Sequence, residues 1–158
     1  MFHIAKVTSF NLHLQIGMET TLIIRHISNW LKNYTEACNS KGFVIGISGG
    51  IDSAVTSTLA AKTGLSLICV ELPIHQNKLQ VKRGSNHIQW LKKKFTNVRS
   101  EKIELTSTFD EFKQLFSEKK HNELALANSR ARIRMAALYY LAQINNSLVL
   151  GTGNKVED

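Results

Sequence analysis

The fold of this chain is indicated most clearly by one stretch of its sequence, Phe43-Val44-Ile45-Gly46-Ile47-Ser48-Gly49-Gly50-Ile51-Asp52-Ser53. Its first five residues are apolar, apart from one glycine, and rich in β-branched side chains, which is typical of a strand buried in a parallel sheet. A polar turn with two adjacent glycines follows. The segment from Ala54 to Thr63 then predicts a helix that ends at Gly64. The stretch therefore predicts a strand, a tight turn and a helix in direct succession.

The same alternation continues on both sides of this stretch. Because strands that alternate with helices are joined by right-handed crossovers, we expect a parallel sheet covered by helices on both faces. The predicted fold class is α/β, a Rossmann-like three-layer sandwich with a parallel sheet. Ligands of such folds bind beyond the carboxyl ends of the strands. Expected helices are 19–39, 54–63, 79–95, 109–119 and 124–145, and expected strands are 43–47, 65–72, 97–105 and 147–151.

Length and composition predict one soluble domain. The chain has 158 residues, of which 43% are hydrophobic, enough to bury a core. We interpret residues 1–17, which have little charge and no clear period, as an N-terminal extension, and residues 18–158 as the domain. Cys38 and Cys69 are too few for a disulfide framework and are expected to be core thiols. No apolar run is long enough to span a bilayer and no export signal is evident, so we expect a cytoplasmic protein without a membrane partner.

A net charge of +8 is concentrated between Lys78 and Lys102. Our main interpretation is the solvated face of a helix, because no aromatic residues are interleaved for base stacking, and we expect no nucleic-acid partner. A nucleic-acid patch is the alternative. Positive potential would also attract a polyanionic small molecule. The basic residues are Lys78, Lys82, Arg83, Lys92, Lys93, Lys94, Arg99 and Lys102.

The turn after the first strand is a candidate phosphate site. Gly49 and Gly50 let the backbone approach an anion, and the free N–H groups and dipole of the following helix favour negative charge. Ser48 and Ser53 add hydroxyl donors. Asp52 would repel a phosphate unless a cation such as Mg²⁺ lies between the two. The alternative is an ordinary helix start with Asp52 or Ser53 as its N-cap.

Two further segments carry polar groups that are candidates for contact with a ligand. Arg130, Arg132 and Arg134 alternate on a predicted helix, so they spread around it, and at least one is a candidate to bind a phosphate or carboxylate. The alternative there is a solvated basic helix with Met135, Leu138 and Leu141 in the core. The segment Gly151-Thr152-Gly153-Asn154-Lys155-Val156-Glu157 follows the last predicted strand and offers a hydroxyl and a carboxylate. Its alternative is a polar loop that leads into a helix.

The Ser-Gly-Gly-x-Asp-Ser turn resembles the pyrophosphate loop of N-type ATP pyrophosphatases, whose fold is adenine nucleotide alpha hydrolase-like. Three more motifs follow in the order found in ammonia-dependent NAD synthetases: Leu72-Pro73, Ala131-Arg132-x-Arg134-Met135 and Gly151-Thr152-x-Asn154-x-x-Glu157. From about Met18 to Asp158, the chain resembles that family.

The resemblance implies a function, a ligand set and residue roles. Family members convert deamido-NAD to NAD: ATP adenylates the nicotinate carboxylate, pyrophosphate leaves, and ammonia displaces AMP. Larger family members carry an N-terminal glutaminase domain, but only 45 residues precede Gly46 here, so we expect free ammonia, or a glutaminase on another chain, as the nitrogen source. The implied assembly is a homodimer. The resemblance assigns Arg132 to deamido-NAD, a structural role to Arg134, and Mg²⁺ to Asp52 and Glu157. The implied ATP-binding residues are Gly46, Ile47, Ser48, Gly49, Gly50, Ile51, Asp52, Ser53 and Thr152.

The family sequence continues beyond the last motif with a Lys-Tyr-Gly-Asp-Gly-Gly-like segment, a lysine that reaches ATP and a threonine. We therefore expect a C-terminally incomplete domain that is inactive or severely impaired alone. A non-catalytic ATP-binding remnant of the same superfamily is the alternative. A tRNA-modifying relative that uses the basic stretch is a weaker third interpretation.

Overall fold

The computed structural model describes residues 7–119 and 122–153, and residues 7–18 only as backbone. Strands and helices alternate after a first long helix, as the sequence predicts. The helices are α1 (Val7–Ala37), α2 (Ile51–Ala61), α3 (Lys78–Lys94), α4 (Thr106–Gln114) and α5 (Glu123–Ile144). The strands are β1 (Gly42–Gly46), β2 (Ser66–Glu71), β3 (Val98–Lys102) and β4 (Leu148–Val149).

All strand pairs of the four-stranded sheet are parallel, and the order is β3-β2-β1-β4. Phe43 of β1 pairs with Leu67 of β2 on one side and with Leu148 of β4 on the other. From β1 the chain first builds the sheet outward through β2 and β3, and it then returns to add β4 on the opposite side of β1. The strand order thus reverses between β1 and β4, and such a reversal opens a crevice at the carboxyl ends of the strands.

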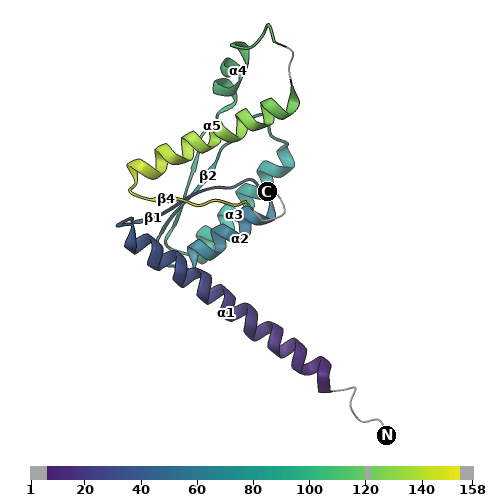
Figure 1. Cartoon of the computed structure of the whole chain (residues 1–158), viewed down its shortest axis with the longest axis vertical. Coiled ribbons are helices and arrows are strands. Elements are labelled where there is room, and N and C mark those ends of the chain that lie inside the picture. The colour runs from purple at the N-terminus through teal and green to yellow at the C-terminus, as the bar shows by residue number, and fades with distance from the viewer. Residues whose placement is uncertain (1–6, 120–121, 154–158) are drawn as a thin grey trace.

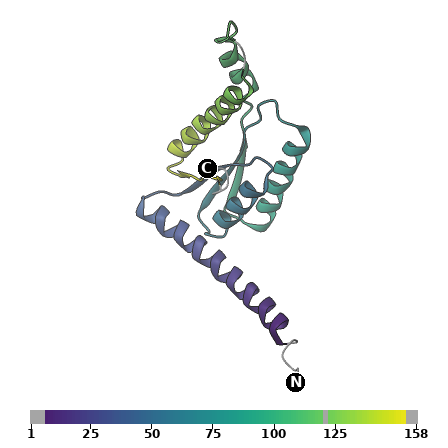
Figure 2. The same cartoon turned by 45° about the vertical axis from the view of Figure 1, so that its right-hand side comes forward.

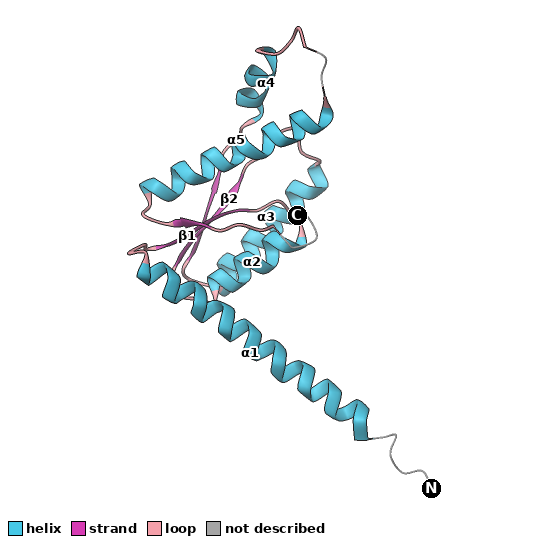
Figure 3. Cartoon of the chain, in the orientation of Figure 1, coloured by secondary structure: helices cyan, strands magenta, loops and turns pink. Residues whose placement is uncertain are grey.

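Helices cover both faces of the sheet, which confirms the predicted three-layer sandwich (Figure 1). Because successive strand side chains point to opposite faces, Phe43 and Ile45 pack against α1, α2 and α3, whereas Val44 packs against α4 and α5. Figures 2 and 3 show α5 across one face of the strands, and α2 and α3, with the packed end of α1, across the opposite face. Both faces of β1 are therefore buried in hydrophobic core.

The first helix differs most from the prediction. It begins at Val7 instead of residue 19, and its N-terminal part extends away from the sheet (Figure 1). The C-terminal part of α1 packs on the domain, where Leu31 is buried, while Trp30 and Tyr34 stack on each other at the surface. Residues 7–18 have no clear apolar period, so the sequence pattern does not indicate the start of this helix.

Other departures are smaller. The last strand has two residues instead of the predicted five. Beyond Val149, one backbone hydrogen bond joins the described residues of this segment to β1, from the Leu150 N–H to the Val44 carbonyl oxygen at 2.9 Å. Cys69 is a core thiol, and burial raises its pKa to about 12. The prediction for Cys38 is wrong, because this side chain lies exposed just after the end of α1. In the part of the chain that the structure describes, no helix is both long and apolar enough to cross a bilayer.

Truncation of a β2 core residue tests this packing. Ile68 of β2 is fully buried on the face of the sheet that α4 and α5 cover. Ile68→Ala is therefore expected to lower the free energy of unfolding by about 2–5 kcal/mol. Val55→Ala, on the outer face of α2 where the side chain is half-exposed, is expected to change it by less than about 1 kcal/mol. Urea denaturation followed by circular dichroism measures both values. Equal losses would contradict the assignment of Ile68 to the core.

Candidate functional site

The loops after β1 and β4 lie at the same edge of the sheet. The Ile47 N–H donates to the Val70 carbonyl oxygen at 2.9 Å and so extends the pairing of β1 with β2 up to the start of the turn. On the other side, β4 runs parallel to β1 and ends at Val149, and half-buried Thr152 follows three residues later. The Ser48–Ser53 turn and the segment that contains Thr152 thus both follow strands that end at this edge of the sheet, where the strand order reverses.

The turn is held against the first turns of α3 by close backbone contact. Gly49 has a φ of +80°, a left-handed conformation that non-glycine residues rarely adopt. A Cβ added to Gly49 would overlap the carbonyl oxygen of Gln80 and would lie 3.3 Å from the Gly84 nitrogen. Gly49 is therefore required both for its backbone conformation and for the approach of the turn to α3.

Hydroxyl groups fix the rest of the turn. The Gly50 N–H donates to Ser48 Oγ at 3.1 Å, and Ser53 Oγ donates to the Gly50 carbonyl oxygen at 3.0 Å. The two serine hydroxyls are 3.2 Å apart. Ser53 is buried, whereas Ser48 is exposed. The serines thus shape the turn from inside, and Ser48 also presents its side chain to solvent.

The N-terminus of α2 has no side-chain cap. Gly50 is the N-cap residue and forms no capping hydrogen bond, so the alternative in which Asp52 or Ser53 caps the helix is not what the structure shows. The first N–H groups of a helix have no acceptor within the helix. The N–H groups of residues 51–53 therefore point out of the helix at its positive end, an arrangement that suits an anion.

Asp52 is exposed in the first turn of α2, and its carboxylate has no hydrogen bond or ion pair with any residue that the structure describes. No cluster of three or more metal-ligating side chains occurs within residues 7–119 and 122–153. A Mg²⁺ ion bound with a nucleotide needs only one or two carboxylates, since phosphate oxygens and waters complete its shell. A free carboxylate beside the turn fits such an ion. Glu157, the second predicted ligand, lies outside the described residues.

A cavity of about 130 Å³ opens at the carboxyl ends of β1 and β2. Arg134 reaches it from α5, and its Nε donates to the Leu72 carbonyl oxygen at 2.9 Å. Burial, with a smaller contribution from repulsion by Arg130, lowers the pKa of the Arg134 guanidinium. This bond joins α5 to the segment after β2, which agrees with a structural role for Arg134. Gly46, Ile47, Ser48, Val70, Gln76 and Leu138 complete the lining.

A second cavity, of about 230 Å³, lies on the α3 side of the turn. Gly49, Gly50 and Ser53 line it from the turn, and Arg83 and His87 line it from α3. His87 Nε2 lies 2.8 Å from Ser57 Oγ, and partial burial lowers the pKa of its imidazole. Sequence reasoning missed Arg83 and His87, because only the packing of α3 against the turn brings them to the site.

Arg132 lies apart from these two cavities. Its side chain is exposed on α5, and its Nη1 donates to the Asn128 carbonyl oxygen of the same helix at 3.2 Å. Its assignment to a substrate stays a prediction. In the alternative core assignment for this helix, Leu138 and Leu141 are confirmed, but Met135 is exposed.

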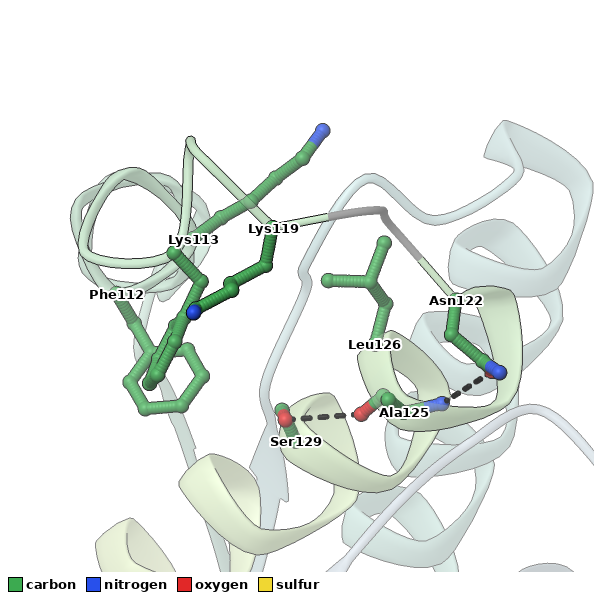
Figure 4. A pocket seen from close by; sticks show the side chains of 8 residues that line it. Phe112, Lys113, Lys119, Asn122, Ala125, Leu126 and Ser129 are labelled. Atoms are coloured by element: carbon green, nitrogen blue, oxygen red, sulfur yellow. Dashed lines mark hydrogen bonds between the residues drawn. The ribbon is translucent and has the colours of Figure 1, made fainter.

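A larger cavity, of about 270 Å³, lies between α4 and α5, away from the turn (Figure 4). Phe112, Phe116 and Leu126 give it an apolar lining, and Lys113 and Lys119 reach it from the α4 side. No residue of the turn or of the strand ends lines it. The polar groups of the candidate site therefore gather at the carboxyl ends of the strands and not at the largest of these three cavities.

Two left-handed glycines allow a matched test of the turn. Gly49→Ala combines an unfavourable φ with overlap of Gln80, so the turn must move, and we expect affinity for ATP to fall at least about tenfold. Gly64→Ala has the same backbone cost, with a φ of +77°, but nothing lies within 4 Å of the added Cβ. It should bind ATP like the wild type. Isothermal titration calorimetry measures both, and equal affinities would contradict a role for the turn.

Comparisons with known proteins agree with this geometry. One relative is the NH(3)-dependent NAD(+) synthetase of Mycoplasma genitalium, which is 38% identical over 85% of this chain and 53% of its own length. Another is the NH(3)-dependent NAD(+) synthetase of Finegoldia magna, which is 35% identical over 89% of this chain and 56% of its own length. The NH3-dependent NAD synthetase of Campylobacter jejuni superposes with a TM-score of 0.77 at 31% identity, over 87% of this chain and 58% of its own. The NMN synthetase of Francisella tularensis superposes with a TM-score of 0.77 at 33% identity, over 85% of this chain and 54% of its own.

The chain thus spans about half the length of the curated relatives it matches. The family model for NAD synthase matches residues 23–158, which include the turn, both strand-end cavities and the last motif. With this match and relatives of 35–38% identity over most of its length, the chain belongs to the NAD synthase family.

Proposed function

We propose that the protein to which this chain belongs converts deamido-NAD to NAD with ammonia and ATP, through an adenylated intermediate, and releases AMP and pyrophosphate. The observation that supports this most directly is the uncapped N-terminus of α2 behind the Ser48–Ser53 turn, in a chain of the NAD synthase family. A turn of this kind binds phosphates without any protein nucleophile. Adenylation requires the same property, because the substrate carboxylate itself attacks ATP.

In this proposal, the N–H groups of residues 51–53 bind the phosphates of ATP, with Gly46 to Gly50 shaping the approach and Thr152 contacting ATP from the β4 side. Asp52 and Glu157 would hold Mg²⁺, which neutralises phosphate charge when bound. The cavity at the carboxyl ends of β1 and β2 would take the adenine ring, with Val70, Leu72 and Leu138 as its apolar lining. Arg132 binds deamido-NAD. Fixed donors of this kind stabilise the charge that develops on pyrophosphate as it leaves.

We also infer a cytoplasmic homodimer. Large apolar side chains are exposed on α5, where Tyr139, Tyr140 and Ile144 are 62%, 68% and 61% exposed. Exposed apolar side chains in such number favour coverage by another surface. Free ammonia is the proposed nitrogen donor, as in the names of the relatives from Mycoplasma genitalium and Finegoldia magna.

The reaction is tested by joining this chain to the C-terminal part of the Mycoplasma genitalium relative that lies beyond the matched region. With ATP, Mg²⁺, ammonium and deamido-NAD, the joined protein should form NAD and pyrophosphate in equal amounts, measured by chromatography. Asp52→Asn should reduce both rates by at least about a hundredfold, because the turn loses its metal-binding charge. Glu111→Gln, on α4, also neutralises an exposed carboxylate that has no ion pair among the described residues; it is the matched control and should keep most of the activity.

Two results would contradict the proposed reaction. Bound ATP without release of pyrophosphate, in a folded joined protein, would favour the non-catalytic ATP-binding alternative. Amidation of nicotinate mononucleotide in preference to deamido-NAD would reassign the substrate, a comparison suggested by the equal TM-score of the neighbour named as an NMN synthetase.

A further inference from the structure

The phosphate-binding turn contains no basic residue. Asp52 is the one charged side chain between Gly46 and Ser53, and it is acidic. The N-terminus of a helix supplies only about half a unit of positive charge, whereas the β- and γ-phosphates of ATP together carry about three negative charges at neutral pH. A cation from another element is therefore needed beside the turn, in addition to any metal ion.

Arg83 is placed to supply that charge. Its Nε donates to the Gly49 carbonyl oxygen at 3.3 Å, so the guanidinium lies directly beside the turn. Contact between the backbones of Gly49 and Gly84, the residue after Arg83, brings this part of α3 so close. The position of Arg83 is thus set by the same packing that holds the turn.

The rest of the guanidinium remains available. Arg83 is exposed, lines the cavity of about 230 Å³ together with Gly50 and Ser53, and forms no ion pair with any residue in the described part of the chain. The other basic side chains between Lys78 and Lys102 do not line this cavity. A guanidinium with free N–H groups in a fork binds two phosphate oxygens at once, which a lysine cannot do.

We propose that Arg83 is a phosphate-binding residue of the site, which binds the β- and γ-phosphates of ATP and stabilises pyrophosphate as it leaves. In the covalent step, a carboxylate oxygen of the substrate attacks the α-phosphorus. The bond from that phosphorus to the bridging oxygen breaks, and the electron pair stays on pyrophosphate. Arg83 meets that charge from the α3 side, opposite the α2 N–H groups. The proposal rests on the proposed function for its covalent step, but its binding part concerns phosphates alone.

The test uses the full 158-residue chain and titrates inorganic pyrophosphate, Mg²⁺-ATP and AMP by calorimetry. Arg83→Ala should weaken pyrophosphate and ATP binding about tenfold to a hundredfold, because a charge-assisted hydrogen bond pair is lost. Affinity for AMP, which lacks the β- and γ-phosphates, should change less than about twofold. Lys82→Ala removes the same charge from the neighbouring exposed position and should leave all three affinities within about twofold.

Folding is controlled with Arg83→Lys, which keeps the charge without the fork and should bind pyrophosphate with intermediate affinity. Wild-type pyrophosphate affinity in folded Arg83→Ala would overturn the proposal. Equal losses of affinity for pyrophosphate and for AMP would also overturn it, because Arg83 would then only shape the turn. A wild-type chain that binds none of the three ligands would overturn it as well. If pyrophosphate binding depends on Arg83 but the joined protein forms no NAD, the proposed reaction fails while this assignment stands.

Discussion

The central position of β1 is the constraint on which the rest of the structure depends. This strand pairs with β2 on one edge and with β4 on the other, and both of its faces are buried. A strand so enclosed is expected to be apolar along its length, as Phe43, Val44 and Ile45 are. Because β2 and β3 lie on one side of β1 and β4 is added later on the other side, the segment that follows β1 lies where the strand order reverses.

The turn after β1 converts that position into a site. Gly49 gives it a left-handed conformation and lets it rest on α3, while hydrogen bonds of the Ser48 and Ser53 hydroxyls fix its shape. The N–H groups at the start of α2 and the carboxylate of Asp52 have no partner among the residues that the structure describes. Phosphates and a magnesium ion match these groups in charge and in ligand preference. The chemistry that we propose thus follows from the groups that the fold leaves without partners.

Sequence patterns predicted the elements whose signals are local. The apolar run of β1, the glycine pair and the alternation of elements were sufficient for the three-layer fold and for the place of the turn. They missed the first part of α1, whose backbone ladder extends without an amphipathic pattern, and the exposure of Cys38. They also missed Arg83, because its hydrogen bond to the Gly49 carbonyl oxygen joins residues 34 positions apart and depends on the packing of α3 against the turn. Glu157 lies outside the described residues, so its predicted role as a metal ligand remains a prediction.

A crystal structure of this chain with ATP and Mg²⁺ is the decisive measurement for phosphate binding at the turn. We expect oxygens of the β- and γ-phosphates within about 3.2 Å of the backbone nitrogens of residues 51–53, with Mg²⁺ between Asp52 and the phosphates. ATP bound elsewhere, for example in the apolar cavity between α4 and α5, with the α2 N–H groups facing solvent, would contradict it.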